Sequence, residues 1–435
     1  MRKTALAVAV GGLFIAPAAQ AQIVFGNETL GTLQLYGKLY PQFGYGSSKD
    51  QSTVGTSVST LVSGTGVCGS STSGAFTTNT GGCASTTPGP RRAVDVQNSY
   101  LGFRGERGLG TALGGLKAIW QIETALNFDD PAASGSTTGR WSTRNSFAGL
   151  SSRGFGTVKL GNMDTIYKEY GDTLQMLGIS SGNFVSASNV LSQIGVGRST
   201  TARFHERKAN SIQYETPQFA GFTAGYQYSP DESRVTSGGG TDASLHSYGV
   251  KWDSRMFYVS VHQEQHNDFF GGSNNVGTTA LSNIGTLGAH SRDTGTRLSL
   301  QVRPIAGHRF TFDVSRLKYR ESGQAAGVKF ESYQHTTWAL GWEGAFGAWH
   351  PSAQYVRGNE GNCSLTGGAA CSTTGLTGYM FNVGLRYDFD RQTGVYAIAG
   401  KLVNGASTRY DNWSAADPAR GADIVQAALG LLYRF

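Results

Sequence analysis

Apolar and polar residues alternate with a period of two in segments that recur along the whole chain. In TLQLYGKLYPQFGYG, residues 32–46, one row is apolar and the other row carries Gln34 and Lys38. The same alternation recurs in residues 116–124, 380–389 and 425–435. Because successive side chains of a β-strand point to opposite faces, each segment is predicted to be a strand with one oily face.

The connections between these segments are alternately short and long. The short ones are rich in Gly, Pro and Asp and fall near residues 107–115, 151–156, 217–221, 253–255, 304–308, 345–348 and 390–394. The long ones are polar and fall near residues 47–93, 128–142, 164–205, 230–244, 266–293, 321–331, 358–377 and 404–422. Seven short turns and eight long loops join sixteen strands.

This alternation distinguishes two all-β architectures. A β-sandwich buries its apolar faces against a second sheet, and its loops need not alternate in length. A membrane β-barrel turns its apolar face to lipid and has short periplasmic turns and long outer loops. We therefore predict an all-β fold, a sixteen-stranded antiparallel transmembrane β-barrel. Aromatic residues lie near segment ends, as in the interfacial girdles of such barrels; they include Phe43, Tyr45, Tyr226, Tyr228, Tyr433 and Phe435.

The first residues and the charge indicate the compartment and the number of domains. Two basic residues precede an apolar run at residues 5–15, and small residues follow at 19–21, so residues 1–21 are predicted to be a secretory signal peptide. No Pro-rich or charge-block linker divides residues 22–435, which are predicted to form one domain. The net charge of +7 falls to +5 without the two basic residues of the signal peptide. The remaining charges are scattered, which argues against nucleic-acid binding.

The four cysteines form two local pairs within stretches rich in Gly, Ser and Thr. Cys68 lies near Cys83, and Cys363 lies near Cys371. Neither pair has the CxxC spacing of a redox or metal site. In an exported protein we therefore expect two loop-closing disulfides.

Catalytic and cofactor motifs are scarce in this sequence. HExxH, CxxC and the P-loop are absent, so we expect neither an enzyme nor a bound cofactor. On a strand, His262, Glu264 and His266 share one face, a spacing that can hold a divalent metal. That face is predicted to line the lumen, where polar residues are the default, so a metal site is the less favoured interpretation.

Five stretches of the chain carry a family resemblance. They are LYG at 35–37, SYLGFRGERGLGTALGGLKAIWQIE at 99–123, FAGLSSRGFGTVKLGN at 147–162, SIQYETPQFAGFTAGYQYS at 211–229 and LGLLYRF at 429–435. Their order and spacing resemble the Gram-negative general porins of the beta-proteobacterial and neisserial type. The resemblance covers nearly the whole chain after residue 21 and is weaker across the long loops.

The resemblance implies an integral outer-membrane protein that passes ions and small hydrophilic solutes passively through a water-filled pore. It implies a homotrimer of sixteen-stranded barrels, in each of which the third long loop folds into the lumen. The expected partners are the two other copies, outer-membrane lipid including lipopolysaccharide, and the barrel-assembly machinery, which would bind the C-terminal strand ending at Phe435.

The predicted constriction combines this loop with the barrel wall. A loop of about forty residues is unusual and more often functional than not, and in a porin its early carboxylates Asp164, Glu169 and Asp172 would face a basic wall. Strand parity assigns the wall, because an Arg at the centre of the lipid face costs about 2–4 kcal/mol. The predicted pore-lining residues of the wall are Lys38, Tyr100, Arg104, Lys159, Arg297, Arg303 and Arg386. A mobile surface loop and a wide vestibule are the alternatives.

Cations that line a pore attract anions, so we expect weak anion selectivity. Two departures from the family pattern oppose it. Tyr100 and Asn162 stand where many relatives have Arg, and inward carboxylates such as Glu123 and Glu215 offset part of the positive charge. A cation-preferring or unselective pore therefore stays open. The alternative functions are a substrate-selective channel on the same barrel and an outer-membrane adhesin or enzyme.

Overall fold

The computed structural model describes residues 23–27, 31–49, 90–96, 98–126, 144–197, 200–230, 242–276, 281–412 and 420–435. The predicted signal peptide, residues 1–21, and the predicted disulfide between Cys68 and Cys83 lie outside these residues.

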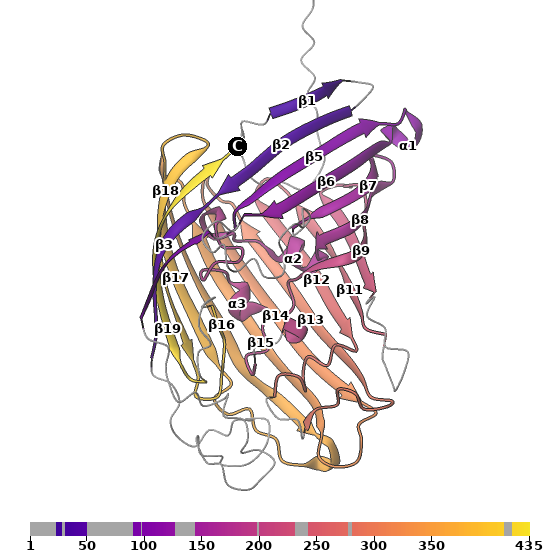
Figure 1. Cartoon of the computed structure of the whole chain (residues 1–435), viewed down its shortest axis with the longest axis vertical. Coiled ribbons are helices and arrows are strands. Elements are labelled where there is room, and N and C mark those ends of the chain that lie inside the picture. The colour runs from indigo at the N-terminus through magenta and orange to yellow at the C-terminus, as the bar shows by residue number, and fades with distance from the viewer. Residues whose placement is uncertain are drawn as a thin grey trace, which may run out of the picture.

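Nineteen β-strands make up most of the described chain (Figure 1). They are β1 Ile23–Asn27, β2 Gly31–Leu39, β3 Pro41–Lys49, β4 Arg91–Val96, β5 Tyr100–Gly108, β6 Lys117–Ala125, β7 Ser146–Ser152, β8 Gly156–Asp164, β9 Arg207–Glu215, β10 Phe222–Pro230, β11 Ser244–Asp253, β12 Phe257–Asn267, β13 His290–Val302, β14 Arg309–Ser322, β15 Phe330–Glu343, β16 Trp349–Leu365, β17 Gly378–Asp388, β18 Thr393–Asn404 and β19 Asp423–Arg434. The helical pieces are α1 Ala112–Gly115, α2 Ile166–Gly171, α3 Ser188–Leu191 and the 3-10 turns Met176–Gly178, Thr200–Ala202 and Thr366–Gly368. In the described part of the chain, no helix is long and apolar enough to cross a membrane.

The strands close into an antiparallel barrel with sixteen wall positions. β2 and β3 together form the first wall strand, and β4 and β5 form the second. The two interruptions meet where the backbone N–H of Tyr40 donates to Ser99 Oγ at 2.8 Å. The strands β6 to β19 supply the other fourteen positions, and β19 returns to pair with β3 and β2. The prediction of a sixteen-stranded antiparallel barrel is confirmed.

The seam of the barrel joins the first and last wall strands, as predicted. The backbone N–H of Gly37 donates to the carbonyl oxygen of Phe435 at 2.9 Å, and the N–H of Phe435 donates to the carbonyl oxygen of Gly37 at 3.1 Å. Beyond this pair the short strand β1, which the sequence did not predict, covers the edge of β2, with Ile23 opposite Leu35. The same edge of β2 is therefore hydrogen-bonded to β1 at its beginning and to the C-terminal strand at its end.

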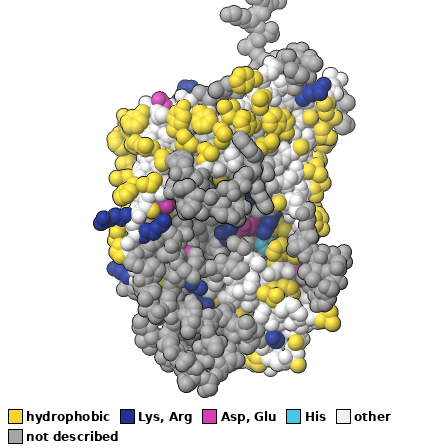
Figure 2. Space-filling model, viewed as in Figure 1, with side chains coloured by type: hydrophobic (Ala, Val, Ile, Leu, Met, Phe, Trp, Pro, Cys, Tyr) yellow, Lys and Arg dark blue, Asp and Glu magenta, His cyan; other side chains and the backbone are white. Residues whose placement is uncertain are grey.

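Burial alternates along the strands as the apolar rows predict. On the outer face Phe43, Leu160 and Leu429 are 55%, 57% and 66% exposed. Figure 2 shows the hydrophobic side chains of this face as a band across the upper part of the barrel. The opposite row is polar and buried in the lumen, for example Ser299 and Gln301 on β13. Hydrocarbon therefore meets the apolar row, and the polar row lines the interior.

The wall differs in height around the barrel. Strands β5 to β9 have seven to nine residues, whereas β13 to β16 have thirteen to seventeen. Two predicted loops were consequently too long, because β13 begins at His290 and β16 continues to Leu365. The outward-facing residues at the outer ends of these strands are polar, as His290, Arg292 and Thr294 are on β13, so these ends lack the apolar outer row that marks a strand in sequence.

Candidate pore constriction

The third loop, residues 165–206 between β8 and β9, folds into the barrel (Figure 1). It begins with α2, where the side chain of Thr165 accepts a hydrogen bond from the backbone N–H of Lys168 and so caps the helix. α2 packs against β10 to β13, and α3 packs against β15 to β17. The α2 side chains Ile166, Tyr167 and Tyr170 are fully buried against the inner face of the wall. The predicted inward-folded third loop is confirmed.

Hydrogen bonds between the loop backbone and the wall hold the first part of the loop in place. The N–H of Tyr167 donates to Ser247 Oγ at 2.8 Å, and Tyr258 Oη donates to the carbonyl oxygen of Tyr170 at 2.7 Å. Further along, Gln301 Nε2 donates to the carbonyl oxygen of Thr173 at 2.7 Å. These contacts and the buried face of the loop exclude a mobile surface loop for its described residues.

The tip of the loop reaches the strands on the far side of the barrel. The N–H of Leu177 donates to Glu343 Oε2 at 2.9 Å, and Asn183 Nδ2 donates to Gln42 Oε1 at 3.0 Å. The tip residues pack into an apolar cluster with the wall that includes Tyr40, Met176, Leu177, Ile179, Phe184, Tyr396 and Ile398. The loop thus spans the lumen from β8 to β3.

The predicted carboxylates of the loop have cations beside them. Asp164 Oδ1 lies 3.0 Å from Lys168 Nζ and 2.9 Å from Arg207 Nη2. Asp172 Oδ1 lies 2.7 Å from His205 Nε2. The negative charge of Asp164 is therefore largely compensated by Lys168 and Arg207, and Asp172 is held by a histidine.

Glu169 has a different environment from the other two carboxylates. It lies on α2 near Lys159, Glu215 and Lys251, and burial raises its pKa to about 7. The two lysines bind Glu215 rather than Glu169, at 3.8 Å from Lys159 Nζ and 3.3 Å from Lys251 Nζ. Lys159 points inward, as parity predicts.

The basic–aromatic wall, by which we mean Tyr36, Lys38, Tyr100, Arg104 and Arg144, lies on β2, β5 and the segment before β7. Lys38 Nζ is 5.1 Å from the centre of the Tyr100 ring, and Arg144 Cζ is 4.9 Å from it. Arg104 Cζ is 4.7 Å from the centre of the Tyr36 ring. Stacking on rings holds cations without neutralising them. Tyr100 therefore serves as the platform for two cations.

Glu123 and Arg144 form contacts in this cluster that the sequence did not identify. Glu123 accepts a hydrogen bond from Tyr36 Oη at 2.8 Å and lies 3.8 Å from Arg144 Nε, so it is the counter-charge of the wall. Parity had placed Glu123 inward without identifying its partners. Arg144 precedes β7 at the end of a long loop, where the period-two pattern does not yet apply.

The remaining predicted cations lie in three different places. Arg297 is buried and pairs with Asp313 at 3.0 Å. Arg386 lies at the loop tip and pairs with Asp388 at 2.9 Å. Arg303 lies beyond the end of β13 and pairs with Asp253 at the short turn between β11 and β12, so the structure does not bring it to the third loop.

The candidate metal ligands do not converge. His266 Nε2 lies 3.0 Å from Glu264 Oε1, but His262 packs edge-on against Tyr167, with ring centres 4.9 Å apart. Throughout the described residues, no group of three His, Cys, Asp or Glu side chains is placed to hold a metal ion. The weak metal-site interpretation is therefore wrong for these residues.

The loop tip also carries a sequence that is known from catalytic sites. Residues 178–182 are GISSG and fit the GxSxG pattern of serine hydrolases. That pattern is catalytic on a sharp strand-to-helix turn. Here it follows the 3-10 turn Met176–Gly178, inside the loop, and no strand precedes it.

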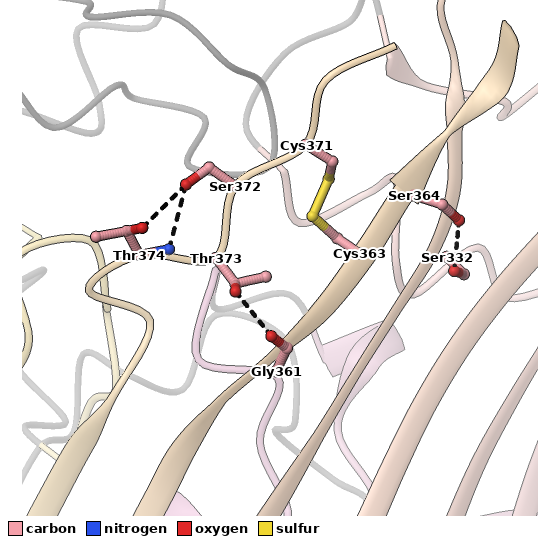
Figure 3. The surroundings of a disulfide bond; sticks show 8 residues. All are labelled: Ser332, Gly361, Cys363, Ser364, Cys371, Ser372, Thr373 and Thr374. Carbon is pink, nitrogen blue, oxygen red and sulfur yellow. Dashed lines mark hydrogen bonds between the residues drawn. A yellow bond between two sulfur atoms is a disulfide. The ribbon is translucent and has the colours of Figure 1, made fainter. Parts of the chain in front are cut away.

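The long connection after β16 is closed by a disulfide. Cys363 on β16 is bonded to Cys371, with the Cα atoms 5.9 Å apart (Figure 3). Both cysteines pack against a buried cluster that includes Tyr333, Leu365 and Leu376. Thr373 Oγ1 also donates to the carbonyl oxygen of Gly361 at 2.7 Å, which holds the connection against the strand. The disulfide thus fixes the outer end of the interior packing.

Comparison with known proteins agrees with this geometry. Residues 4–407 match the Gram-negative porin family. The chain is similar to the major outer membrane protein P.IB of Neisseria lactamica, with 24% identity over 314 residues, which is 71% of this chain and 77% of that protein.

Two solved structures have the same fold. The anion-selective porin from Comamonas acidovorans has a TM-score of 0.61 and 17% identity, covering 93% of this chain and 100% of that one. The trimer form of in-vitro folded OmpT of Vibrio cholerae has a TM-score of 0.55 and 14% identity, covering 93% and 99%. The protein is an integral outer-membrane channel rather than a soluble catalyst, and the chain belongs to the Gram-negative porin family of diffusion porins.

Proposed function

We propose that this porin passes ions and small hydrophilic solutes through one off-centre opening and weakly prefers anions. The observation that carries the proposal is the position of the basic–aromatic wall. The helical pieces of the third loop pack against β10 to β13 and β15 to β17, whereas the wall lies on β2, β5 and the segment before β7. A solute that passes the loop therefore moves between the loop and this wall.

The balance of charge across this opening favours anions. On the loop side, Asp164 has Lys168 and Arg207 beside it, and Asp172 lies against His205. On the wall side, Lys38 and Arg104 lie over tyrosine rings, and Arg144 lies 3.8 Å from the carboxylate of Glu123. Low-dielectric walls focus the potential of such cations into the opening.

Reversal potentials in a salt gradient test this proposal. The folded protein in planar bilayers should give stepwise, ohmic currents and a reversal potential of the sign for anion preference. The variant K38Q/R104Q should shift the reversal potential toward cation preference. R153Q/R255Q removes two exposed cations at short turns and should shift it less. Cation preference of the unmodified protein would refute the selectivity, and absence of conductance would refute the pore.

We also propose a homotrimer in which the low side of the wall faces the other copies. A tilted transmembrane strand needs about 9–11 residues, and β7 has seven. Covering this side with protein removes the mismatch with the bilayer. The trimeric solved form of OmpT supports the stoichiometry.

Lipid accessibility tests this arrangement. Leu150 on β7 and Leu298 on β13 both point outward, at 42% and 39% exposure. A fluorescent label at L298C should be quenched by brominated lipid, and a label at L150C should not. Equal quenching at both positions, or a monomeric mass by light scattering, would contradict the proposal. Recognition of the C-terminal strand by the assembly machinery remains a prediction.

A further inference from the structure

The C-terminal strand places a further cation in the lumen. Arg434 is the last residue of β19 and lies directly opposite Lys38 on β2. Leu432 is buried and Tyr433 points outward, so by the alternation of a strand Arg434 shares the inward face with Leu432. The backbone N–H of Arg434 donates to the carbonyl oxygen of Gln392 at 2.9 Å, at the short turn between β17 and β18. Arg434 therefore lies at the short-turn end of the lumen.

Cations and tyrosine rings alternate from the basic–aromatic wall to this residue. Lys38, which stacks on Tyr100, also lies 4.9 Å from the centre of the Tyr40 ring. Arg434 Cζ lies 5.8 Å from the centre of the same ring, and Arg434 Nε donates to Tyr40 Oη at 2.8 Å. One tyrosine thus holds two cations from neighbouring strands, and Arg434 extends the row of cations beyond the wall.

These two cations have no carboxylate partner in the part of the chain that the structure describes. No carboxylate there forms an ion pair with Lys38 or Arg434. The carboxylates of this region pair with other cations, namely Glu123 with Arg144, Glu343 with Arg309 and Asp388 with Arg386. Like charges directly opposite on neighbouring strands repel each other and destabilise a sheet. An anion beside Lys38 and Arg434 would therefore remove an unfavourable interaction.

Both cations can be reached from the lumen. Lys38 and Arg434 are partly exposed, whereas the Tyr40 ring that they share is buried. The tip of the third loop lies close to Arg434, because a Cβ atom at Gly178 would lie 3.3 Å from Arg434 Nη2. The guanidinium group therefore lies between the wall and the loop tip, next to the opening through which the proposed route passes.

We propose that Arg434 is a specificity-determining residue, which together with Lys38 forms a second anion site at the short-turn end of the constriction. The site takes a small oxyanion with two negative charges, because two cations without counter-charges meet on one ring. The planar guanidinium group of Arg434 matches two oxygen atoms of such an anion, and Lys38 adds a point charge. This inference rests on the proposed function, since the anion reaches the site through the same opening.

Block of the chloride current by sulfate tests this site, with the folded full chain in planar bilayers at constant ionic strength. In the unmodified protein, sulfate should reduce the chloride current in a saturable manner, because a bound dianion occupies the route. R434Q should raise the sulfate concentration for half-maximal block at least about tenfold, because a charge-assisted contact with the anion is lost.

The matched control is R391Q, which removes an exposed cation of the short turn beside Arg434 and should leave the block unchanged. Heat-modifiable gel migration shows that each variant is folded. If R434Q fails to fold, K38Q tests the same site and should weaken the block to a similar extent.

Three results would overturn the second anion site. They are absence of saturable block in the unmodified protein, an unchanged half-maximal concentration in the folded site variant, and an equal effect of R391Q. The proposed anion preference fails by a different measurement, the sign of the reversal potential of the unmodified protein in a gradient of potassium chloride. The two failures are therefore distinguishable.

Discussion

Arg386 Nη1 donates a hydrogen bond of 2.9 Å to the carbonyl oxygen of Leu177. This contact joins β17 to the tip of the third loop at a residue whose φ angle is +54°, in the left-handed region that a leucine rarely adopts. Glu343, the last residue of β15, accepts a hydrogen bond from the N–H of the same residue. The wall thus fixes both polar groups of a strained residue at the point where the loop crosses the lumen.

Removing the Arg386 contact should loosen the tip. A hydrogen bond to a charged group contributes about 1.5–3 kcal/mol, so R386Q is expected to increase the population of detached tips by one to two orders of magnitude. The measurement is open-channel current noise of single pores. R357Q, which changes an outward-facing arginine of β16, is the control and should leave the noise unchanged. Equal noise in both variants would show that the contact does not hold the loop.

The seam should be sensitive to a single methyl group at Gly37. A Cβ atom there would lie 2.7 Å from Phe435 Cζ and 2.7 Å from the carbonyl oxygen of Tyr100. G37A should therefore destabilise the barrel by about 1–3 kcal/mol through overpacking. The readout is the temperature at which the folded gel band disappears. G108A is the matched control, because a Cβ at Gly108 meets no atom within 4 Å. An unchanged transition temperature for G37A would mean that the seam accommodates the methyl group without loss of stability.

The disulfide between Cys363 and Cys371 should stabilise the outer end of the interior packing. Closing a loop of this length contributes about 2–3 kcal/mol on chain entropy. C363S/C371S should therefore unfold at lower urea concentration and become more susceptible to proteolysis near Leu376. The serine variant is needed because a reductant would also act on Cys68 and Cys83. If neither the urea unfolding nor the proteolysis changes with the substitution, the disulfide does not have this role.

Glu169 should make selectivity depend on pH. Its pKa of about 7 means that it is neutral in mildly acidic solution and becomes a carboxylate as the pH rises through neutrality. Each pore then gains one negative charge, so the preference for anions should fall between about pH 5.5 and pH 8.5. The charged groups around it are Lys159, Asp164, Glu215 and Lys251.

The matched variant for this prediction is E169Q, measured by reversal potential at both pH values. It should keep the low-pH selectivity throughout, because its amide does not ionise in this range. If E169Q follows the same pH dependence as the unmodified protein, Glu169 is not the responsible group.

The alternation of apolar rows and of short and long connections, together with the family resemblance, predicted the barrel and its strand number, and strand parity predicted the inward direction of Lys38, Lys159 and Arg386. Parity depends only on the two faces of a strand, so it carries over directly from sequence. It could not show how deep a residue lies, and for this reason Arg303 was expected near the constriction although it lies at a short turn.

Contacts between distant segments were also beyond the sequence pattern. The pairing of Asp172 with His205 depends on how the two arms of the third loop return past each other. The platform formed by Tyr100 depends on Arg144 arriving from the end of another loop. Strand β1 was missed because its five residues are too few to show a period-two alternation of apolar and polar side chains.

The position of the third loop also has a consequence for transport. Since the helical pieces of the loop pack against β10 to β13 and β15 to β17, the route proposed above takes water and solutes along one flank of the barrel and not along its axis. A small solute on this route stays within reach of the stacked tyrosines and their cations for its whole passage through the narrow zone. The rate at which it crosses then depends on its residence time at that flank. A bulky neutral molecule and a compact charged one therefore differ in transport rate through their binding to the wall as much as through their size.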